Sequence, residues 1–442
     1  MAMKILFVSL GCDKNRVDAE KMLGLLSGQG WQLTDDELEA DVIVINTCCF
    51  INEAKEESIR NILEYARCKE EGHCRALICT GCMAQRYAEE IREELPEVDA
   101  VVGTTAYDRI AEVIQEALRG ERSQVMDDLS RLALPQGERV LTTGGHYAYL
   151  KIAEGCDKHC TYCAIPSMRG HYRSYPMDVL VSQAKMLADS GVKELILVAQ
   201  ETTVYGVDLY GKKKLPTLLR KLCRIGGIRW IRILYCYPEE ITEDLISVMA
   251  KEKKICHYLD LPIQHASDRI LKLMGRRTSR SDLEQIVKRL REAIPDITLR
   301  TTLISGFPGE TEEDHEELLR FVEEMRFDHL GVFPYSREEG TPAAKYPSQV
   351  PARIKKKRRN QVMRLQQKVS AGRLREKIGT VAEVLVEGRL PEEDVYIGRT
   401  CMDAPDVDGY LFFTAPYELM SGTFVKVRVT DASEYDLKGE MI

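Results

Sequence analysis

Two stretches of the sequence alternate short apolar runs with segments of helical periodicity, and this pattern restricts the fold more than any other feature. The apolar runs of the first stretch are KILFVSL (4–10), DVIVINT (41–47), RALICT (75–80) and AVVG (100–103). Strands that are apolar throughout are typical of parallel sheets with helices on both faces. We therefore expect an N-terminal parallel α/β sheet domain over residues 1–120.

The alternation returns with longer periods between residues 146 and 345. Six apolar runs are candidate strands, at residues 147–153, 194–200, 230–236, 258–263, 298–304 and 329–335. Six strand–helix units predict a (β/α)6-type partial TIM barrel, in which functional residues lie at the C-terminal ends of the strands. We assign this barrel to residues 142–372. The Gly-, Gln-, Arg- and Ser-rich stretch at 120–145 is typical of a linker.

The C-terminal part of the chain contains a basic helical segment followed by an acidic, β-rich segment. Residues 351–377 form a helical segment with eleven Lys or Arg and one Glu. This segment is either a solvated linker helix or a contact for nucleic acid, and the lack of interleaved aromatic residues favours the linker. From residue 378 on, short β-rich runs broken by Gly and Pro predict a small antiparallel β-barrel, which we place at residues 375–442. Residues 378–442 carry five Lys or Arg against thirteen Asp or Glu.

Composition excludes several classes of protein. The chain has 442 residues, 44% of them hydrophobic, and a net charge of −8, which argues against a protein that binds nucleic acid over its whole surface. No apolar run approaches the roughly 18 residues that cross a membrane. We expect a cytoplasmic protein without membrane contact. Its fourteen cysteines are then reduced thiols available for metals or catalysis.

The stretch EGCDKHCTYCAIPSMRG (154–170) places three cysteines in one polar loop after the first barrel strand. These residues, Cys156, Cys160 and Cys163, are called the barrel triplet below. Thiolates suit soft metals, above all iron–sulfur clusters and zinc. A zinc site normally has four ligands and would also need His159 or His171. A cubane cluster held by three cysteines instead leaves one iron free to bind a small molecule.

Three further cysteines follow strands of the N-terminal domain. Cys12 follows the first predicted strand, Cys48 the second and Cys82 the third; together they are called the N-terminal triplet. Because parallel strands end at one edge of their sheet, we expect these thiols to form a second three-thiolate site. Cys49 competes with Cys48 for its position. Cys79 and Cys82 form a CxxC pair, which could be a redox pair. The position of Cys79 within the apolar strand, however, favours a place in the hydrophobic core.

Polar and glycine residues at the predicted barrel rim are candidates for cofactor contacts. The segment ISGFPGET (304–311) lacks the Lys-Ser/Thr of a phosphate-binding P-loop, which argues against a nucleoside triphosphatase. Its glycines, Gly306 and Gly309, would admit an adenine-bearing ligand. Gln200, Glu201 and Gln264 lie on the same rim. Each of these side chains could equally be a hydrogen-bonded cap.

Taken together, these motifs resemble a known family. CDKHCTYC has the CxxxCxxC spacing of radical S-adenosylmethionine (radical SAM) enzymes. LGCDKN, NTCCFI and TGCMAQRY resemble the N-terminal domain of the methylthiotransferases within that group. QETTVYGVD, LPIQHAS and GFPGETEED are similar to that family's core, and the tail is similar to its TRAM domain. The resemblance covers essentially the whole chain.

The resemblance implies two [4Fe–4S] clusters and S-adenosyl-L-methionine as cofactors. The barrel triplet would hold the cluster whose open iron binds S-adenosyl-L-methionine, which one-electron reduction cleaves to a 5′-deoxyadenosyl radical. The N-terminal triplet would hold an auxiliary cluster that carries the sulfur to be inserted. The contribution of the protein is then to hold two open irons toward one cavity shielded from solvent.

The family has two branches that differ in substrate. One branch modifies adenosines in tRNA, and the other modifies an aspartate of the small-subunit ribosomal protein uS12. AIPSMRG (164–170) and GRTCMDAPDVDG (398–409) resemble the second branch. An acidic C-terminal domain would also repel tRNA phosphates and attract a basic ribosomal protein. We therefore expect a methylthio group on the β-carbon of the aspartate, with tRNA adenosine 2-methylthiolation as the alternative.

The expected partners follow from the same resemblance. They are uS12, free or on the small ribosomal subunit, and a low-potential electron donor such as flavodoxin or ferredoxin; tRNA is not expected to bind. A hypothesis from another class is a zinc-stabilised adaptor that binds nucleic acid without catalysis. The metal bound by the two triplets, iron or zinc, distinguishes an enzyme from such an adaptor.

Overall fold

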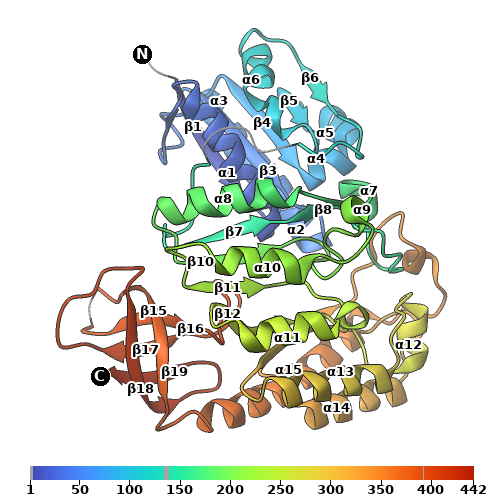
Figure 1. Cartoon of the computed structure of the whole chain (residues 1–442). Helices are drawn as coiled ribbons and strands as arrows, with labels where there is room; N and C mark the ends of the chain where they lie inside the picture. The colour runs from blue at the N-terminus through green and yellow to red at the C-terminus, as the bar shows by residue number, and fades with distance from the viewer. Residues whose placement is uncertain (1–2, 134–138, 392) are drawn as a thin grey trace.

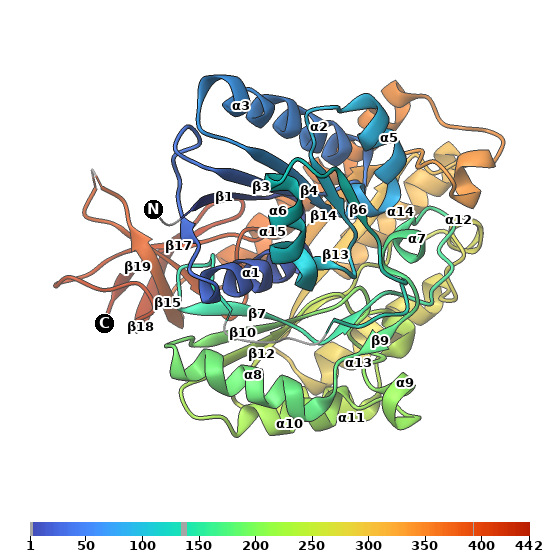
Figure 2. The ribbon, with the colours of Figure 1, turned by 90° about the horizontal axis from the view of Figure 1, so that it is seen from above.

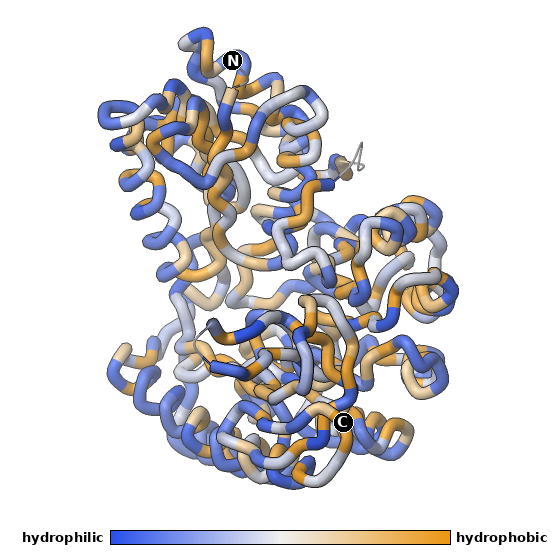
Figure 3. Tube along the Cα trace, turned by 90° about the vertical axis from the view of Figure 1, so that its left-hand side faces the viewer, coloured by the Kyte–Doolittle hydropathy of each residue, from blue (hydrophilic) through white to orange (hydrophobic). Residues whose placement is uncertain are grey.

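The computed structural model describes residues 3–133, 139–391 and 393–442. It has an N-terminal sheet with its helices, a second sheet with helices on its outer side, and a small β-barrel (Figure 1). Hydrophobic residues gather inside these parts, and the outer helices carry many hydrophilic positions (Figure 3). Among the described residues, no helix is long and apolar enough to cross a membrane.

The N-terminal sheet is parallel throughout, as expected. In spatial order its strands are β2 (Gln32–Leu33), β1 (Lys4–Ser9), β3 (Val42–Thr47), β4 (Ala76–Gly81), β5 (Ala100–Val102) and β6 (Ser123–Val125). β3 and β4 are buried at every residue, which explains their continuous apolar runs. β6 lies in the stretch interpreted as linker. As an edge strand with the sequence SQV it has no apolar run, so the sequence pattern missed it. Residues 134–138 of that stretch lie outside the described residues.

Helices cover both faces of this sheet. They are α1 (Asp13–Gly28), α2 (Asn52–Ala66), α3 (Cys68–Glu71), α4 (Cys82–Arg86), α5 (Ala88–Glu94), the 3-10 turn η1 (Tyr107–Arg109) and α6 (Ile110–Leu118). α1 and α6 pack on one face, and α2, α4 and α5 pack on the other. α1 also contacts the second sheet, because Val17 packs beside Tyr147 and Tyr149. One helix therefore joins the two sheets (Figure 2).

All six predicted barrel strands are present and parallel. Their order is β14 (His329–Pro334), β13 (Thr298–Ser305), β12 (Ile255–Asp260), β11 (Trp230–Ile233), β10 (Glu194–Val198) and β7 (Tyr147–Lys151). β12 begins three residues before the predicted range. β7 and β14 are the two outer strands of this sheet, so the partial barrel predicted from the sequence is confirmed. A short antiparallel pair, β8 (Ala153–Glu154) and β9 (Arg173–Ser174), frames the loop that carries the barrel triplet.

The helices of this region follow the strands in sequence. They are α7 (Ile165–Arg169), α8 (Met177–Asp189), α9 (Val207–Tyr210), α10 (Leu215–Cys223), η2 (Pro238–Glu240), α11 (Glu243–Lys251), α12 (Asp268–Leu273), α13 (Arg280–Ala293), α14 (Glu312–Met325), η3 (Pro342–Lys345) and α15 (Ala352–Arg375). Capping boxes begin two of them: Ser279 with Asp282 starts α13, and Thr311 with Asp314 starts α14. These boxes satisfy amide groups that a helix start leaves free.

The C-terminal part is a closed five-stranded barrel. Its strands are β15 (Val381–Arg389), β16 (Tyr396–Thr400), β17 (Leu411–Thr414), β18 (Phe424–Ala432) and β19 (Leu437–Met441). Four ladders are antiparallel, but β17 pairs with β19 in parallel, a departure from the wholly antiparallel barrel expected. Buried charges attach this barrel to the central sheet: Arg399 and Arg232 bind the Glu194 carboxylate at 2.7 and 2.8 Å.

The C-terminal edges of the two parallel sheets lie against each other. α7 follows the first barrel strand, and its Met168 packs in the apolar core on one face of the N-terminal sheet. The Thr104 hydroxyl, after β5, donates to the Met168 carbonyl at 2.7 Å. Both edges that carry cysteine loops therefore meet at one interface.

Candidate metal centres

The barrel triplet lies in the loop between β8 and α7. Gly155, just before Cys156, has a φ of +79°, and a Cβ there would lie 2.0 Å from the His171 carbonyl oxygen. Only glycine permits this approach of the two ends of the loop. The Cys156 amide then donates to the Gly170 carbonyl at 3.1 Å and closes the loop. The loop is thus held at its base while its three thiols project from it.

Hydrogen-bond donors surround the three sulfur atoms. The Lys158 amide lies 3.4 Å from Cys156 Sγ, and the Ile165 amide lies 3.5 Å from Cys163 Sγ. Cys160 Sγ lies 3.5 Å from the Tyr237 hydroxyl. Burial raises the pKa of Cys156 and Cys163 to about 12. Buried thiols that already have donors around sulfur fit a site where a soft metal takes the place of the proton.

The two histidines that a zinc site would need are exposed to solvent. His171 is 90% exposed and its Nδ1 contacts Asp157 Oδ1 at 2.9 Å, and His159 is exposed. Within the described part of the chain, no three His, Cys, Asp or Glu side chains are grouped closely enough to hold one metal ion. An iron–sulfur cluster spreads its ligands over several irons and needs wider spacing. The arrangement fits a three-cysteine cluster better than a Cys3His zinc site.

The cysteines of the N-terminal triplet each follow a strand of the parallel sheet; Cys12 is exposed, Cys48 is buried and Cys82 is partly buried. Cys12 follows β1, Cys48 follows β3, and Cys82 begins α4 directly after β4. Two glycines permit the approach. A Cβ on Gly11 (φ +89°) would lie 2.7 Å from Cys48 Cβ, and a Cβ on Gly81 (φ +93°) would lie 2.5 Å from the carbonyl oxygen just before Cys48. Any larger residue at either glycine would push one cysteine loop away from the middle one.

Cys48 and its neighbour Cys49 differ in surroundings. The Ser58 hydroxyl accepts from the Cys48 amide at 3.0 Å and donates to the Cys48 carbonyl at 2.8 Å, which fixes that turn. Burial, followed by the nearby Cys82 and Cys12, raises the pKa of Cys48 to about 12. The Cys49 thiol instead contacts the Met168 sulfur at 3.2 Å, on the barrel side. Both thiols lie near Cys82, but the Cys48 turn is fixed by Ser58 and the Cys49 thiol also packs between the domains.

The remaining cysteines have core or intermediate positions. Cys79 is 1% exposed within β4, and its sulfur lies 3.8 Å from the Thr47 hydroxyl, as its place in an apolar strand predicts. Cys68, Cys74, Cys236 and Cys256 are buried as well, and Cys223 and Cys401 are partly buried. These residues need no role beyond packing.

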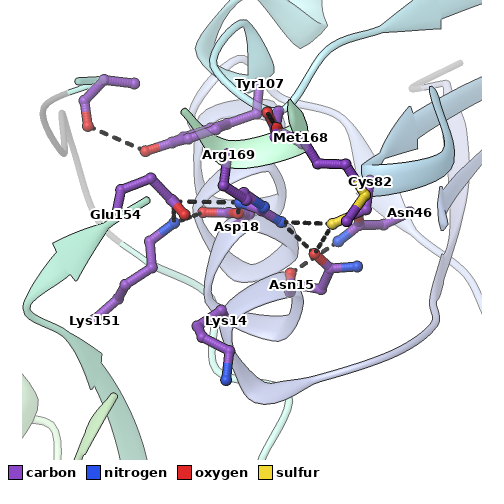
Figure 4. Close-up of polar contacts among 12 residues, drawn as sticks. Lys14, Asn15, Asp18, Asn46, Cys82, Tyr107, Lys151, Glu154, Met168 and Arg169 are labelled. Atoms are coloured by element: carbon purple, nitrogen blue, oxygen red, sulfur yellow. Dashed lines mark hydrogen bonds and ion pairs between the residues drawn. The ribbon is translucent and has the colours of Figure 1, made fainter. Parts of the chain in front are cut away.

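Arg169, the penultimate residue of the loop stretch 154–170, reaches Cys82 of the N-terminal triplet (Figure 4). One guanidinium nitrogen lies 2.7 Å from Asp18 and 3.2 Å from Glu154. The other lies 3.4 Å from Cys82 Sγ and also donates to Asn15. Arg169 is 3% exposed. A cation from the barrel-triplet loop therefore contacts a sulfur of the N-terminal triplet.

Lysines and tyrosines complete this buried network. Lys151, at the end of β7, binds both Asp18 and Glu154, so two cations face two carboxylates. Lys21 lies beside it, with its ammonium 3.2 Å from the Tyr107 hydroxyl. Burial and the charge of Lys151 lower the pKa of Lys21 to about 7. The two cations and two carboxylates of this network are thus buried and balance each other in charge.

Gln200 and Glu201 lie at the end of β10, as predicted. Gln200 donates to Glu154 at 2.8 Å, and Glu201 accepts from the Thr203 amide at 3.0 Å and faces the Tyr237 amide at 3.5 Å. Gln200 Oε1 and Glu201 Oε2 are buried without a hydrogen-bond partner among the described residues. Burial raises the pKa of Glu201 to about 7. Two unsatisfied buried oxygens beside the barrel triplet suit a polar ligand with donor groups.

The other three candidates for cofactor contacts are Gln264, Gly306 and Gly309. Gln264 has a φ of +74° and bridges to β13 at Leu303, on the same strand-end rim. The Gly306 amide donates to Glu310 Oε2 at 2.7 Å, so a side chain already caps that amide. The Gly309 amide donates to the Ser348 carbonyl at 2.9 Å, on the outer side of the loop. The two glycines shape the rim, and their amides have partners within the chain.

Sequence reasoning missed the residues that join the two triplets. Asn15 and Arg169 lie within the quoted stretches LGCDKN and AIPSMRG, and Asp18 lies in neither. Nothing in these stretches pairs Arg169 with partners that lie 151 and 154 positions away in the sequence. One signal was present: Gly precedes a cysteine in LGC, TGC and EGC, and all three glycines have positive φ. The repeated Gly-Cys pair marks loops that must approach another segment closely.

Comparisons with known proteins cover most of the chain. Residues 4–103 match the model of uncharacterized protein family UPF0004, residues 150–322 match the radical SAM superfamily, and residues 378–442 match the TRAM domain. Three similar curated proteins are each named ribosomal protein uS12 methylthiotransferase RimO. The protein of Lachnoclostridium phytofermentans is 61% identical and covers 99% of both chains. That of Pelotomaculum thermopropionicum is 52% identical over 100% of both, and that of Clostridioides difficile is 48% identical over 100% of this chain and 99% of its own.

Solved structures share the fold at low sequence identity. The radical S-adenosylmethionine methyltransferase TsrM of Kitasatospora setae aligns with a TM-score of 0.56 at 14% identity, covering 78% of this chain and 77% of its own. The cobalamin-dependent S-adenosylmethionine radical enzyme OxsB aligns with a TM-score of 0.53 at 13% identity, covering 83% and 56%. These likenesses concern the arrangement of the sheets.

Proposed function

We propose a function from one premise: the chain belongs to the RimO family of radical SAM methylthiotransferases. It adds a methylthio group to the β-carbon of an aspartate in ribosomal protein uS12. Relatives between 48% and 61% identical over nearly the whole chain carry that name. The acidic C-terminal barrel supports a basic protein as substrate rather than tRNA.

In this proposal the barrel triplet holds a [4Fe–4S] cluster at the catalytic edge of residues 142–372. Three thiols with donors around sulfur and no histidine turned toward them support an iron–sulfur site with one open position. Such a cluster with bound S-adenosyl-L-methionine supplies a carbon radical that abstracts hydrogen from the substrate. Gln200 and Glu201 present their unsatisfied oxygens to the polar end of the cofactor.

The N-terminal triplet, within residues 1–120, holds the second [4Fe–4S] cluster and with it the sulfur to be inserted. The glycines before Cys12 and Cys82 bring the three loops together, which supports one shared centre rather than three separate core cysteines. The Ser58 hydroxyl holds the middle loop, so Cys48 is the ligand and Cys49 is not. This assignment gives each triplet a distinct task.

One observation carries the proposal: Arg169 leaves the barrel-triplet loop and contacts Cys82 at 3.4 Å. The loop of the barrel triplet therefore reaches a sulfur of the N-terminal triplet through a buried side chain. Asp18 and Glu154 neutralise both Arg169 and Lys151 there, and this buried ion network shields the space between the triplets from water. A reactive carbon radical needs such shielding, and sulfur insertion needs the two centres to serve the same substrate atom. A low-potential donor such as flavodoxin or ferredoxin supplies the electron.

The test is an anaerobic reaction of the reconstituted chain with dithionite and S-adenosyl-L-methionine. Purified uS12 and bulk tRNA are offered in separate samples, and mass spectrometry follows the mass of a methylthio group. The expected result is modification of one aspartate of uS12 and unmodified tRNA. Modification of tRNA alone would show that the substrate assignment is wrong.

Metal analysis tests the chemistry independently of the substrate. Two clusters predict about eight irons and eight sulfides per chain, since each cubane holds four of each. Zinc without iron would instead indicate a structural adaptor without catalysis. Because this measurement needs no substrate, it separates an incorrect substrate from an incorrect enzyme class.

A further inference from the structure

Helix α15 is the most strongly charged element of the chain. Its 24 residues include ten Lys or Arg and no Asp or Glu. Part of this charge is used within the fold: Arg358 binds Glu310 at 2.9 Å, and Arg373 binds Asp328 at 2.7 Å. Other cations of this helix have no such partner among the described residues of the fold.

Five exposed cations of α15 lie along one line. At 100° per residue their positions fall within about 60° of the helix circumference, and at 1.5 Å per residue they span about 33 Å. We call this set the basic stripe: Arg353, Lys357, Arg364, Lys368 and Arg375, all exposed. Neighbours separated by four residues are about 6 Å apart along the axis, and like charges at that spacing destabilise a helix.

The fold does not neutralise the basic stripe. None of its five residues forms an ion pair with any carboxylate in the described parts of the chain. The nearest acidic element is α14. Its Glu312 binds Arg358 at 3.0 Å, and its Glu323 lines the same shallow groove as Arg364 and Lys368 without an ion pair to either. Five positive charges therefore face solvent.

The stripe runs from the catalytic edge to the C-terminal barrel. At its start, the Lys355 ammonium donates to the Tyr335 carbonyl, just after β14, at 2.8 Å. A Cβ on Gly306, at the cofactor rim, would lie 2.4 Å from the Lys355 side chain. At its end, α15 leads directly into β15 (Figure 1). Lys355 lies on the face of α15 opposite the stripe, about 170° away at 100° per residue. A partner on the stripe would therefore extend along the outer face of the helix, from the catalytic end of the sheet to the C-terminal barrel.

The C-terminal barrel has the opposite charge. Its exposed carboxylates include Glu418, Asp431, Glu434 and Glu440. A free basic protein would be attracted by this barrel but repelled by the stripe. A bare RNA would be attracted by the stripe but repelled by the barrel. A particle that presents a basic protein next to RNA phosphates complements both surfaces.

We propose that the basic stripe binds the phosphate backbone of RNA next to uS12, so that the substrate is uS12 within the assembled small ribosomal subunit. This inference rests on the proposed function and specifies the form of its substrate. Arg and Lys along one helix face contact phosphates without reading base sequence. The stripe therefore positions the particle, and the triplets perform the chemistry.

The test compares two variants that change the net charge equally. In the stripe variant all five residues of the basic stripe are replaced by Gln. In the control variant five exposed cations on the α9–α11 side of the barrel are replaced in the same way: Lys212→Gln, Lys221→Gln, Arg224→Gln, Lys251→Gln and Lys253→Gln. Binding of the reconstituted proteins to purified small subunits is measured from about 50 to 200 mM salt, and modification rates are measured on subunits and on free uS12.

The stripe variant should bind subunits at least about tenfold more weakly at low salt. Its plot of log affinity against log salt should be shallower by about four units, because each of the five lost phosphate contacts removes about 0.7 to 0.9 units of slope. Its rate on free uS12 should stay within about twofold of the unchanged chain, and the control variant should match the unchanged chain on subunits.

Equal loss of subunit binding in both variants, or none in either, would overturn the proposal. So would loss of affinity for bulk tRNA with subunit binding unchanged, since the stripe would then serve another RNA. If the unchanged chain modifies neither substrate, the proposed function fails. The subunit-binding measurement still decides the role of the stripe in that case.

Discussion

Arg169→Met tests whether the two triplets act through the buried contact that joins them. The substitution keeps a long side chain and removes the guanidinium. It leaves Asp18 and Glu154, two buried carboxylates, facing the single ammonium of Lys151. It also removes the donor that lies 3.4 Å from Cys82 Sγ. Packing is largely retained, so the effect reports the lost charge and hydrogen bonds.

The expected magnitudes follow from burial and distance. Removing one partner of a buried ion pair destabilises a protein by about 3–5 kcal/mol, because it leaves an uncompensated charge. Burial opposes the charge of Arg169, yet Cys82, Glu154 and Asp18 hold its pKa above the ordinary value. An electron taken up about 6 Å from this cation interacts with it by about 2–3 kcal/mol at an effective dielectric constant near 20. Its loss should lower the potential of the second cluster by about 100 mV.

The assay separates cofactor cleavage from sulfur insertion. Arg169→Met should still form 5′-deoxyadenosine, because the barrel triplet is unchanged. Methylthio product per 5′-deoxyadenosine should fall about tenfold or more. The potential of each cluster is read from reductive titrations followed by electron paramagnetic resonance. Iron content per chain shows whether both clusters assemble.

Arg169→Lys is the matched control, because it retains the positive charge. A single ammonium cannot reproduce the fork in which one nitrogen binds the carboxylates and the other binds Asn15 and Cys82. The cluster potential should therefore stay close to that of the unchanged chain, with product yield between the two extremes. If Arg169→Met leaves the potential and the product ratio unchanged, the coupling through this residue is refuted.

Three further predictions concern the cysteines and a buried lysine. The triple variant Cys12→Ala, Cys48→Ala, Cys82→Ala should contain half the iron per chain. It should no longer insert sulfur but should still cleave the cofactor; loss of cleavage would contradict separate roles for the triplets. Cys49→Ser should keep the full iron content, because its sulfur packs against methionine; a drop to half would make it a ligand. Burial lowers the pKa of Lys21 to about 7, below the value of about 10.4 in an unfolded chain. At this residue the unfolded state therefore binds more protons between pH 7 and 10, so Lys21 destabilises the fold at pH 7 and does so less as the pH rises; Lys21→Met should raise the thermal midpoint at pH 7, and the difference from the unchanged chain should shrink toward pH 10.

Burial decided which elements of the fold could be predicted. β3 and β4 are buried at every residue, so their sequences are continuously apolar and their ends, with Cys48 and Cys82, follow from the pattern. β6 is an edge strand whose first two residues are partly exposed, and its polar sequence carries no such signal. The parallel β17–β19 ladder depends on how short strands close a barrel, which local sequence does not encode.

Some residues of the candidate site could likewise be predicted from the sequence, and others could not. The cysteines could be placed because parallel topology brings strand ends to one edge. The contacts of Arg169 could not, because Asp18 and Asn15 belong to another domain and nothing in their spacing relates them to residue 169. The negative charge of the C-terminal barrel could be predicted from its composition. The basic stripe of α15 could be recognised only once the partners of Arg358 and Arg373 were known.

The Gly-Cys pairs explain why these cysteines could not simply be core residues. Gly11, Gly81 and Gly155 all have positive φ, and a Cβ at each would lie under 3.0 Å from another segment. A buried thiol alone would need none of these approaches, because strand packing already covers it, as it does for Cys79. The chain instead uses three glycines, each with a cost in conformational entropy, to bring a cysteine loop against its neighbour. That cost is explained if the loops must hold sulfur atoms at defined mutual positions, which a metal cluster requires and a hydrophobic core does not.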